Sequence, residues 1–381
     1  MGRCMGVDLP TGDALADDRE ALRASIRSLL ERTSPEAEVR RLMDSEQGYD
    51  EAAWRLAAEQ VGLPGLGIPE ELGGSGFGPL ELAIVFEEMG RALYCGPFFA
   101  TVGLAASVLL SSRDAAAHKE WLPGIAAGTT LATFAFTETP SGGDVASVAA
   151  TASRTGESWQ LQGTKWFVVD GHVADLVLVV ARTDGGIGVF AVEGDAAGLT
   201  REPMVTMDAT RRMSRLTFDN VQGRLVGEEA TGQHMVEKAL QLAAVALAAE
   251  SVGGAQKCLE LSADYARERI QFGRPIGSFQ AVKHKLANIL IQVEQARSAA
   301  YFAAREAAQD SADLAMAASL AKAYTADAFY AAAAETIQIH GGVGFTWEHP
   351  AHLYFKRAKT NQLLLGSSAH HRAVVADAVG I

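Results

Sequence analysis

The spacing of apolar residues changes twice along this chain of 381 residues, and these changes constrain its fold more than any single motif. Residues 14–127 repeat apolar side chains at helical spacing, interrupted by a segment rich in Gly and Pro at 61–78. Residues 128–222 contain short β-rich runs separated by Gly, Ser, Asp and Glu. Helical spacing returns over 233–381. The sequence therefore predicts an α+β multidomain protein with an N-terminal helical domain, a middle β-barrel or sandwich, and a C-terminal four-helix bundle.

The C-terminal part contains the longest helical runs. The run that begins near Gln233 is apolar on nearly all sides over its first half, which predicts a buried helix. Further helices are predicted from Phe279 to about Gln309 and from Asp313 to Ile339, where two glycines follow as a stop signal. A last helix is predicted to begin near Ser367.

Composition and charge argue against several classes of protein. Hydrophobic residues make up 48% of the chain, which is enough for a packed core. The formal net charge of −13 argues against nucleic acid or an anionic membrane as the main partner. Charged residues interrupt the alanine-rich runs before they reach the ~20 apolar residues of a membrane span. The N-terminal residues lack the apolar segment of a signal peptide.

The three cysteines are scattered. Cys4, Cys95 and Cys258 show no C-x-x-C spacing. An odd number without a pairing framework is typical of a reducing compartment, so a cytoplasmic location is predicted, and a cysteine-ligated metal site is excluded.

The segment from Glu268 to Gln280 predicts a helix end, a tight turn and a new helix N-terminus that opens at Ser278. The free N–H groups and positive dipole end of such an N-terminus suit an anionic group such as a phosphate. Arg269 and Arg274 would add charged donors. The alternative is an ordinary interhelical loop capped by Ser278.

Five strings in this order resemble the acyl-CoA dehydrogenase family of flavoproteins, and the resemblance covers nearly the whole chain. The strings are GLPGLGIPEELGGSG (62–76), FTETPSGGDVAS (136–147), KWFVVDG (165–171), RIQFGRPIGSFQ (269–280) and IQIHGGVGFT (337–346). The resemblance implies FAD as cofactor, an acyl-CoA thioester as substrate and an electron-accepting flavoprotein as partner. It also implies assembly as a homodimer or homotetramer. The implied reaction is α,β-desaturation, in which a carboxylate removes the α-proton and the β-hydride passes to flavin N5.

The same resemblance implies which residues approach the flavin of this chain. They are Phe136, Thr137 and Gly142 of the first loop, and Trp166 and Val168 of the following strand. The chain departs from the family at two places, because Gly143 and Val168 stand where the family carries Ser and Thr.

A second set of residues is implied to reach the FAD of a neighbouring subunit. In the segment from 269 to 280 these are Arg269, Phe272 and Gln280. In the segment from 337 to 346 they are Gln338, Gly341 and Gly342, where glycine leaves room for close backbone approach. His340 is expected to be a structural histidine.

The proton acceptor of the family is missing from its usual places. Leu365 stands at the position of the family's catalytic Glu, and Ala243 at the position used by a minority of members. The nearest acid is Glu250, two helical turns beyond Ala243 and about 10 Å along the axis. Glu250 is either a buried base with a raised pKa or a structural carboxylate paired with an arginine.

Three functions remain open at this point. The chain is an acyl-CoA dehydrogenase with Glu250 as an unusual base, or a catalytically incomplete flavin-binding subunit that pairs with a base-bearing homologue. A flavin oxygenase or nitroalkane-type oxidase would need its own acid near Leu365, and the sequence has none there. Small side chains before Glu250 either make room for a bulky acyl group or permit close helix packing.

Overall fold

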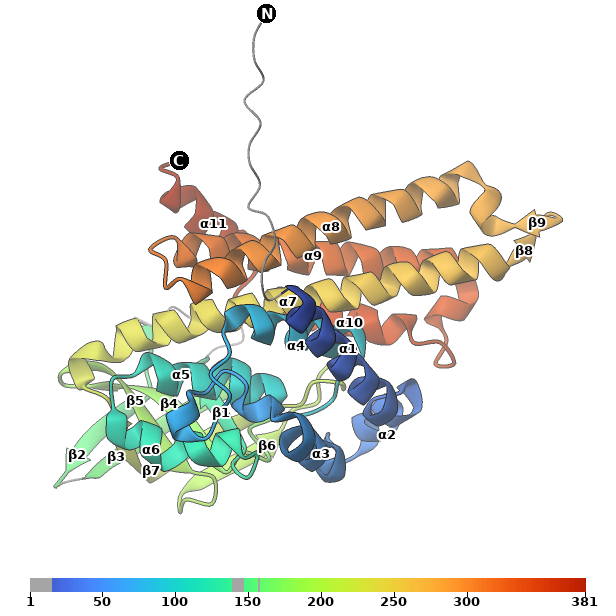
Figure 1. Cartoon of the computed structure of the whole chain (residues 1–381). Coiled ribbons are helices and arrows are strands. Elements are labelled where there is room, and N and C mark those ends of the chain that lie inside the picture. The colour runs from blue at the N-terminus through green and yellow to red at the C-terminus, as the bar shows by residue number, and fades with distance from the viewer. Residues whose placement is uncertain (1–15, 139–146, 157) are drawn as a thin grey trace, which may run out of the picture.

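The computed structural model describes residues 16–138, 147–156 and 158–381. Helices, a β-barrel and a second set of helices follow one another along the chain, and the predicted fold class is confirmed (Figure 1). The long helices of the C-terminal part lie across the other two parts and cover the barrel on one side (Figure 1).

The N-terminal part consists of short helices. Its α-helices are α1 (Ala16–Thr33), α2 (Glu36–Asp44), α3 (Glu51–Val61), α4 (Pro79–Arg91), α5 (Ser107–Ser111) and α6 (Ala115–Ala126), with a π-helix at Phe99–Ala106 before α5. Polar residues begin two of these helices, because Asp50 accepts a hydrogen bond from the backbone of Ala53 and Asp114 caps α6 in the same way. Gly62 ends α3 with φ of 68°, a conformation that favours glycine.

The middle part is a closed sheet. Its strands are β1 (Ala132–Ala135), β2 (Thr151–Thr155), β3 (Ser158–Val169), β4 (Leu176–Thr183), β5 (Gly186–Glu193), β6 (Leu199–Pro203) and β7 (Met213–Val226). The pairings β4–β5, β5–β7, β7–β3, β3–β2 and β2–β4 close a barrel, and β1 and β6 add to its edges. β6 was not predicted.

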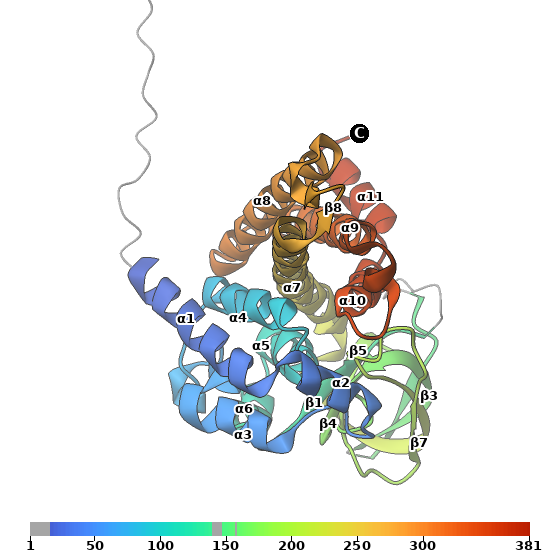
Figure 2. The ribbon, with the colours of Figure 1, turned by 90° about the vertical axis from the view of Figure 1, so that its right-hand side faces the viewer.

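The C-terminal part is built on long antiparallel helices (Figure 2). They are α7 (Gly232–Glu268), α8 (Gln280–Ala308) and α9 (Leu314–His340), followed by the shorter α10 (Ala351–Leu363) and α11 (Ser368–Ala378). α10 was not predicted. A small hairpin of β8 (Ile270–Gln271) and β9 (Arg274–Pro275) joins α7 to α8 at the end of the bundle far from the barrel (Figure 1).

One hydrophobic core runs through all three parts. Its largest cluster includes Phe86 of α4, Val179 of β4 and Leu247 of α7. The core is continuous across the three parts and marks no boundary between them. The predicted domain limits of 14–127, 128–222 and 233–381 therefore stay a prediction. Among the described residues, no helix combines the length and apolar character needed to cross a bilayer.

Close contact between α4 and α7 depends on glycine. A Cβ on Gly253 would lie 1.7 Å from the carbonyl oxygen of Glu87, and one on Gly90 would lie 1.9 Å from that of Glu250. Gly253→Ala is therefore expected to lower the free energy of unfolding by about 1–3 kcal/mol, measured by chemical denaturation. Gly78→Ala is the matched control, since its Cβ would meet only a side-chain oxygen at 3.4 Å. Equal stability of the two variants would contradict the helix contact.

Candidate active site

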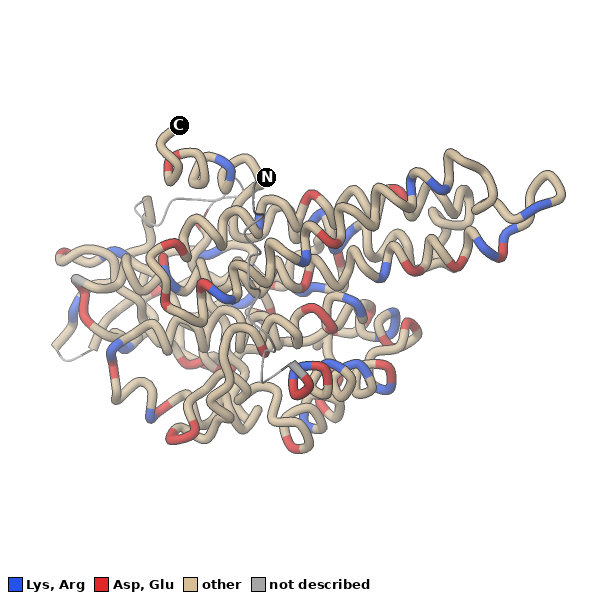
Figure 3. The backbone as a smooth tube through the Cα atoms, turned by 45° about the horizontal axis from the view of Figure 1, so that its top comes forward, with Lys and Arg blue, Asp and Glu red and all other residues tan. Residues whose placement is uncertain are grey.

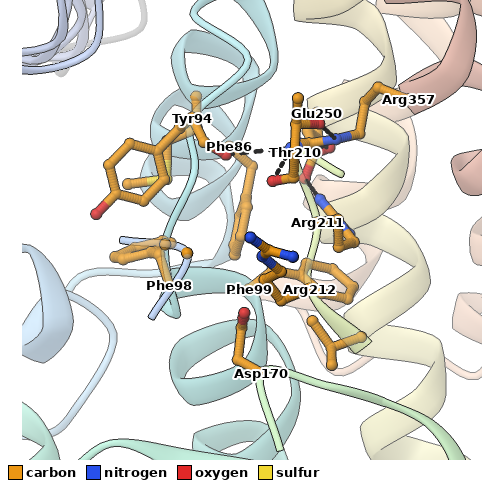
Figure 4. A pocket seen from close by; sticks show the side chains of 14 residues that line it. Phe86, Tyr94, Phe98, Phe99, Asp170, Thr210, Arg211, Arg212, Glu250 and Arg357 are labelled. Atoms are coloured by element: carbon orange, nitrogen blue, oxygen red, sulfur yellow. Dashed lines mark hydrogen bonds and ion pairs between the residues drawn. The ribbon is translucent and has the colours of Figure 1, made fainter. Parts of the chain in front are cut away.

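A buried cluster of charges joins the three parts of the molecule (Figure 4). Glu250 of α7 accepts hydrogen bonds from Arg211, which precedes β7, and from Arg357 of α10, with 3.0 Å between Arg357 Nη1 and Glu250 Oε1. Arg357 Nε lies 3.2 Å from Asp208 Oδ2, and its Nη2 donates to the carbonyl of Tyr94. The four charged residues are at most 6% exposed. Two guanidinium groups thus neutralise two carboxylates that would be costly to bury alone.

Glu250, the candidate proton acceptor, is held inside this cluster. Burial would raise its pKa, but the charges of Arg211 and Arg357 outweigh burial and hold the pKa below its ordinary value. Asn361 adds a donor at 3.3 Å from Oε1. A carboxylate with both oxygens occupied and a lowered pKa is ionised at neutral pH and is a weak proton acceptor. The geometry favours a paired structural role for Glu250.

A cavity of about 20 Å³ lies beside the cluster. Phe86, Phe98 and Phe99 form its apolar wall, and Asp170 faces the charged cluster from the end of β3 (Figure 4). This volume holds about one water molecule, far less than the ~300 Å³ or more of a typical ligand pocket. The cavity therefore belongs to the junction of the three parts and leaves no room for an acyl chain.

Asp170 is the carboxyl group of this cavity with a raised pKa. Burial raises the pKa to about 7, against the opposing charges of Arg211, Arg357 and Arg212. Between pH 4, near the ordinary pKa of an aspartate, and about pH 7, Asp170 therefore keeps its proton in the folded protein but loses it in the unfolded chain. Stability falls as pH rises through this window, and the cost is fully present above pH 7.

Asp170→Asn is expected to be more stable than the parent chain at pH 8 by about 1–3 kcal/mol. At pH 4.5, where Asp170 is protonated in the folded state, the two proteins should differ little. Chemical denaturation at both pH values measures the difference. Asp208→Asn is the comparison, since Asp208 accepts from Arg357 and Thr210 and its loss should destabilise the protein at both pH values. A destabilised Asp170→Asn at pH 8 would contradict this account.

Two segments expected at a flavin are held together in the structure. The backbone N–H of Trp166 donates to the carbonyl of Thr137 at 2.8 Å. Phe136, beside Thr137, stacks on Phe134 with 5.2 Å between ring centroids. The guanidinium of Arg215 lies 5.1 Å from the ring centroid of Trp166. All three expected residues are half-buried, so each keeps an exposed part.

The remaining residues expected near the flavin differ in their setting. Val168 is buried and pairs with Ser214 of β7, so its side chain packs into the barrel. Gly142 lies outside the described residues.

The turn after α10, where the resemblance places the family's acid, is held by several buried partners. Leu365 has φ of 64°, a strained conformation for a leucine. The ammonium group of Lys322 donates to the carbonyls of Gln362 and Gly366, and His371 Nε2 lies 3.0 Å from the Leu365 carbonyl. Burial lowers the pKa of Lys322 to about 8. Strained backbone that is fixed by several buried partners is a feature of functional turns.

The hairpin between α7 and α8 projects from the bundle, and basic residues mark it in Figure 3. Phe272 at its turn has φ of 52° and is 91% exposed. Arg269 and Arg274 are exposed, and neither forms an ion pair within the described part of the chain. Gln280, also exposed, is the first residue of α8. The hairpin lies at the end of the bundle far from the barrel, and so far from the flavin-lining segments of its own chain (Figure 1).

The second segment expected at a neighbouring FAD lies at the same end of the bundle. Gln338 is exposed on the last turn of α9. A Cβ on Gly341 or Gly342 would meet no atom within 4 Å, so both glycines border open space. His340 stacks on Tyr265 near the end of α7 with 4.3 Å between ring centroids, which fixes this segment beside the hairpin.

Three family models match consecutive parts of the chain. The acyl-CoA dehydrogenase N-terminal domain matches residues 16–129, the middle domain residues 133–221 and the C-terminal domain residues 230–380. The chain belongs to the acyl-CoA dehydrogenase family. The activity of the family, FAD-dependent dehydrogenation of acyl-CoA thioesters, makes this chain an oxidoreductase of lipid metabolism, as predicted.

Similar acyl-CoA dehydrogenases match nearly the full length. The chain is 36% identical to acyl-CoA dehydrogenase IpdE2 of Mycobacterium tuberculosis over 352 residues, which is 92% of this chain and 94% of that protein. A solved variant of the Tcur3481-Tcur3483 steroid ACAD is 33% identical, with a TM-score of 0.88 over 96% of this chain and 98% of that one. The ChsE4-ChsE5 complex of Mycobacterium tuberculosis is 29% identical, with a TM-score of 0.88 over 98% and 100%.

Sequence reasoning missed the partners that fix Glu250 in this acyl-CoA dehydrogenase. Arg357 lies on a helix that was not predicted, and Arg211 lies in a loop. Asp170 follows an apolar run, where a charged residue at a strand end is a weak signal of burial. Their common property is long-range pairing, which local spacing does not reveal.

Proposed function

We propose that this chain is a flavin-binding subunit of an acyl-CoA dehydrogenase that assembles with a homologous subunit carrying the proton acceptor. The observation that carries this proposal is the state of Glu250, whose carboxylate is occupied by Arg211 and Arg357. Leu365 and Ala243, at the two positions where the family places its base, cannot accept a proton. The alternative, a lone homo-oligomer with Glu250 as base, requires a carboxylate that is free to reach a substrate.

The residues present fit both the flavin ring and the diphosphate and adenosine part of FAD. Thr137 and Trp166 would line the flavin ring of this chain. Arg269, Phe272 and Gln280, with Gln338 and the two glycines after His340, would contact the diphosphate and adenosine of the FAD in the neighbouring subunit. Open space at Gly341 and Gly342 supports this assignment, as do the hairpin arginines, which form no ion pair with another residue that the structure describes. When bound, FAD accepts the hydride from the acyl β-carbon.

This chain's own groups have limited roles in that reaction. The backbone N–H of Leu365, on a turn held by Lys322 and His371, would donate to the oxygen of a thioester bound by this chain and so orient it, while this chain supplies no proton acceptor. Removal of the α-proton falls to the homologous subunit at its own flavin. An electron-accepting flavoprotein would be the redox partner of the assembled enzyme, as the family resemblance implies. A cytoplasmic location remains part of this proposal.

Arg269→Gln is expected to weaken FAD binding at least about 10-fold, because a charge-assisted bond to a phosphate is lost. Flavin retained after gel filtration, measured by absorbance, tests this. The melting temperature of the flavin-free protein should not change, since Arg269 forms no ion pair with any residue of the described chain. Arg267→Gln is the control, because Arg267 lies two residues before Arg269 and pairs with Asp264 instead. Unchanged flavin content in Arg269→Gln would contradict the assignment.

Co-expression tests the proposal itself. The chain alone and the chain with a homologue that carries a Glu at the Leu365 or Ala243 position are assayed with a panel of acyl-CoA thioesters. The expected result is flavin-dependent turnover only in the presence of the homologue. Equal turnover by the chain alone would overturn the subunit proposal and favour the homo-oligomer.

A further inference from the structure

One buried ion pair lies next to the two residues that the proposed function places at the flavin ring. Lys165 Nζ lies 2.6 Å from Glu138 Oε1, and the side chain of Lys165, on β3, is fully buried. Glu138 follows Thr137 along the chain, and Lys165 precedes Trp166. Because the backbone N–H of Trp166 also donates to the carbonyl of Thr137, the loop and the strand are joined twice at this point.

The carboxylate of Glu138 also holds the return of its own loop. Its Oε2 accepts from the backbone N–H of Ala149 at 2.6 Å, and its Oε1 accepts from that of Ala150 at 2.9 Å. Hydrogen bonds to a charged group are stronger than those between neutral groups. Glu138 therefore joins residues 138, 149 and 150 to one point on β3.

β3 is irregular where it presents Trp166. Between Lys165 and Val168, β3 has two residues where the paired strand β7 has one. This is a β-bulge, and Phe167 within it has φ of 53°. A left-handed backbone is strained for phenylalanine and persists only where the surrounding contacts enforce it. The contacts that fix the ends of the bulge therefore decide where the ring of Trp166 lies.

The burial of Lys165 is costly. Burial lowers its pKa to about 8, although Glu138 opposes the change. A buried ion pair often adds no stability over apolar groups of similar volume, and in several proteins it specifies one arrangement of the chain instead. Such a pair, at the start of a strained bulge, is suited to select one position of the strand against the loop.

We propose that Glu138 and Lys165 are positioning residues for the flavin ring. They set how the neighbouring Thr137 and Trp166 meet the ring, because Lys165 holds β3 at the start of the bulge and Glu138 holds the loop against it. This inference rests on the proposed function, which places Thr137 and Trp166 at the ring. The family resemblance assigned no role to either member of the pair.

Glu138→Gln is expected to weaken FAD binding about 10-fold or more, because its charged bonds to Lys165 and to two backbone N–H groups are lost. The dissociation constant is measured on the purified flavoprotein from the fluorescence of FAD released on dilution. The absorption band of the bound flavin is expected to shift as well. Glu229→Gln is the matched control, since Glu229 accepts from Thr183 in the same part of the molecule and forms no ion pair within the described chain. It should leave both readouts unchanged.

A double variant separates positioning from stability. Glu138→Gln combined with Lys165→Met removes the unpaired buried cation, so its melting temperature is expected to recover towards that of the parent. The affinity for FAD and the absorption band should stay altered, because the link between loop and strand is still broken.

The outcomes separate this inference from the proposed function. If the parent binds FAD and Glu138→Gln changes neither the affinity nor the absorption band, the inference is overturned and the proposed function stands. If affinity and band recover together with the melting temperature in the double variant, the pair acts through stability alone, and the inference is overturned. If the parent chain holds no flavin, alone or with the homologue, the proposed function fails and the inference fails with it.

Discussion

Leu365→Glu is expected to give this chain its own acyl-CoA desaturation activity, with a rate of flavin reduction about 10²–10⁴ times that of the parent. The substitution places a carboxylate on the turn where the family resemblance places the base, and general base catalysis contributes a factor of this size. The turn is already fixed by Lys322 and His371, so the new side chain starts from a defined backbone. Anaerobic stopped-flow absorbance with a panel of acyl-CoA thioesters measures the rate.

Leu365→Gln is the matched control, because glutamine has the size of glutamate and cannot accept the α-proton. The account predicts no gain in this variant. A parent chain that already reduces its flavin at the rate of Leu365→Glu would contradict the absence of a base. A gain that is equal in both variants would show that shape and polarity at position 365, not a proton acceptor, limit the rate.

Arg357→Met is expected to lower the free energy of unfolding by about 3–5 kcal/mol. Arg357 contacts Asp208, Glu250 and two backbone carbonyls from a position that is 2% exposed. Methionine fills much of the volume but leaves two buried carboxylates with one guanidinium between them. A loss of this size is a large fraction of the stability of a domain, so urea denaturation resolves it easily.

A double substitution separates charge from packing in this cluster. Arg357→Met combined with Glu250→Leu removes a cation and an anion together, and replacement of a buried ion pair by apolar groups is often neutral or stabilising. We expect the double variant to recover part of the loss. If the single variant is as stable as the parent, the cluster does not hold the three parts together. If the double variant is less stable by the sum of both single losses, the two side chains do not act as a pair.

The architecture could be predicted from the sequence because each part keeps one spacing of apolar residues over a long stretch. α8 and α9 begin and end within one residue of the predicted limits, since Gly and Pro precede α8, polar residues separate the two helices at 309–313, and two glycines follow α9. α10 was missed because residues 351–363 mix apolar, basic and amide side chains without a clear stripe. β6 was missed because most of its residues are exposed, so its sequence shows no run of apolar residues.

The site was predicted less completely, for a physical reason. Glu250 could be singled out because a charged residue interrupts an apolar run, and the sequence left open whether an arginine pairs with it. Its partners lie 39 and 107 residues away along the chain, so only the folded structure brings them together. The lining role of Thr137 and Trp166 and the interface role of Arg269 and Phe272 remain predictions that depend on the family resemblance.

Exchange of the acyl α-proton with deuterated water tests most directly whether this chain contains a proton acceptor. The purified flavoprotein is incubated with a panel of acyl-CoA thioesters, and the deuterium content of the recovered thioester is measured by mass spectrometry. We predict no exchange above the uncatalysed rate for the chain alone, and rapid exchange once the base-bearing homologue is present. Rapid exchange by the chain alone that disappears in Glu250→Gln would contradict the account and identify Glu250 as the base.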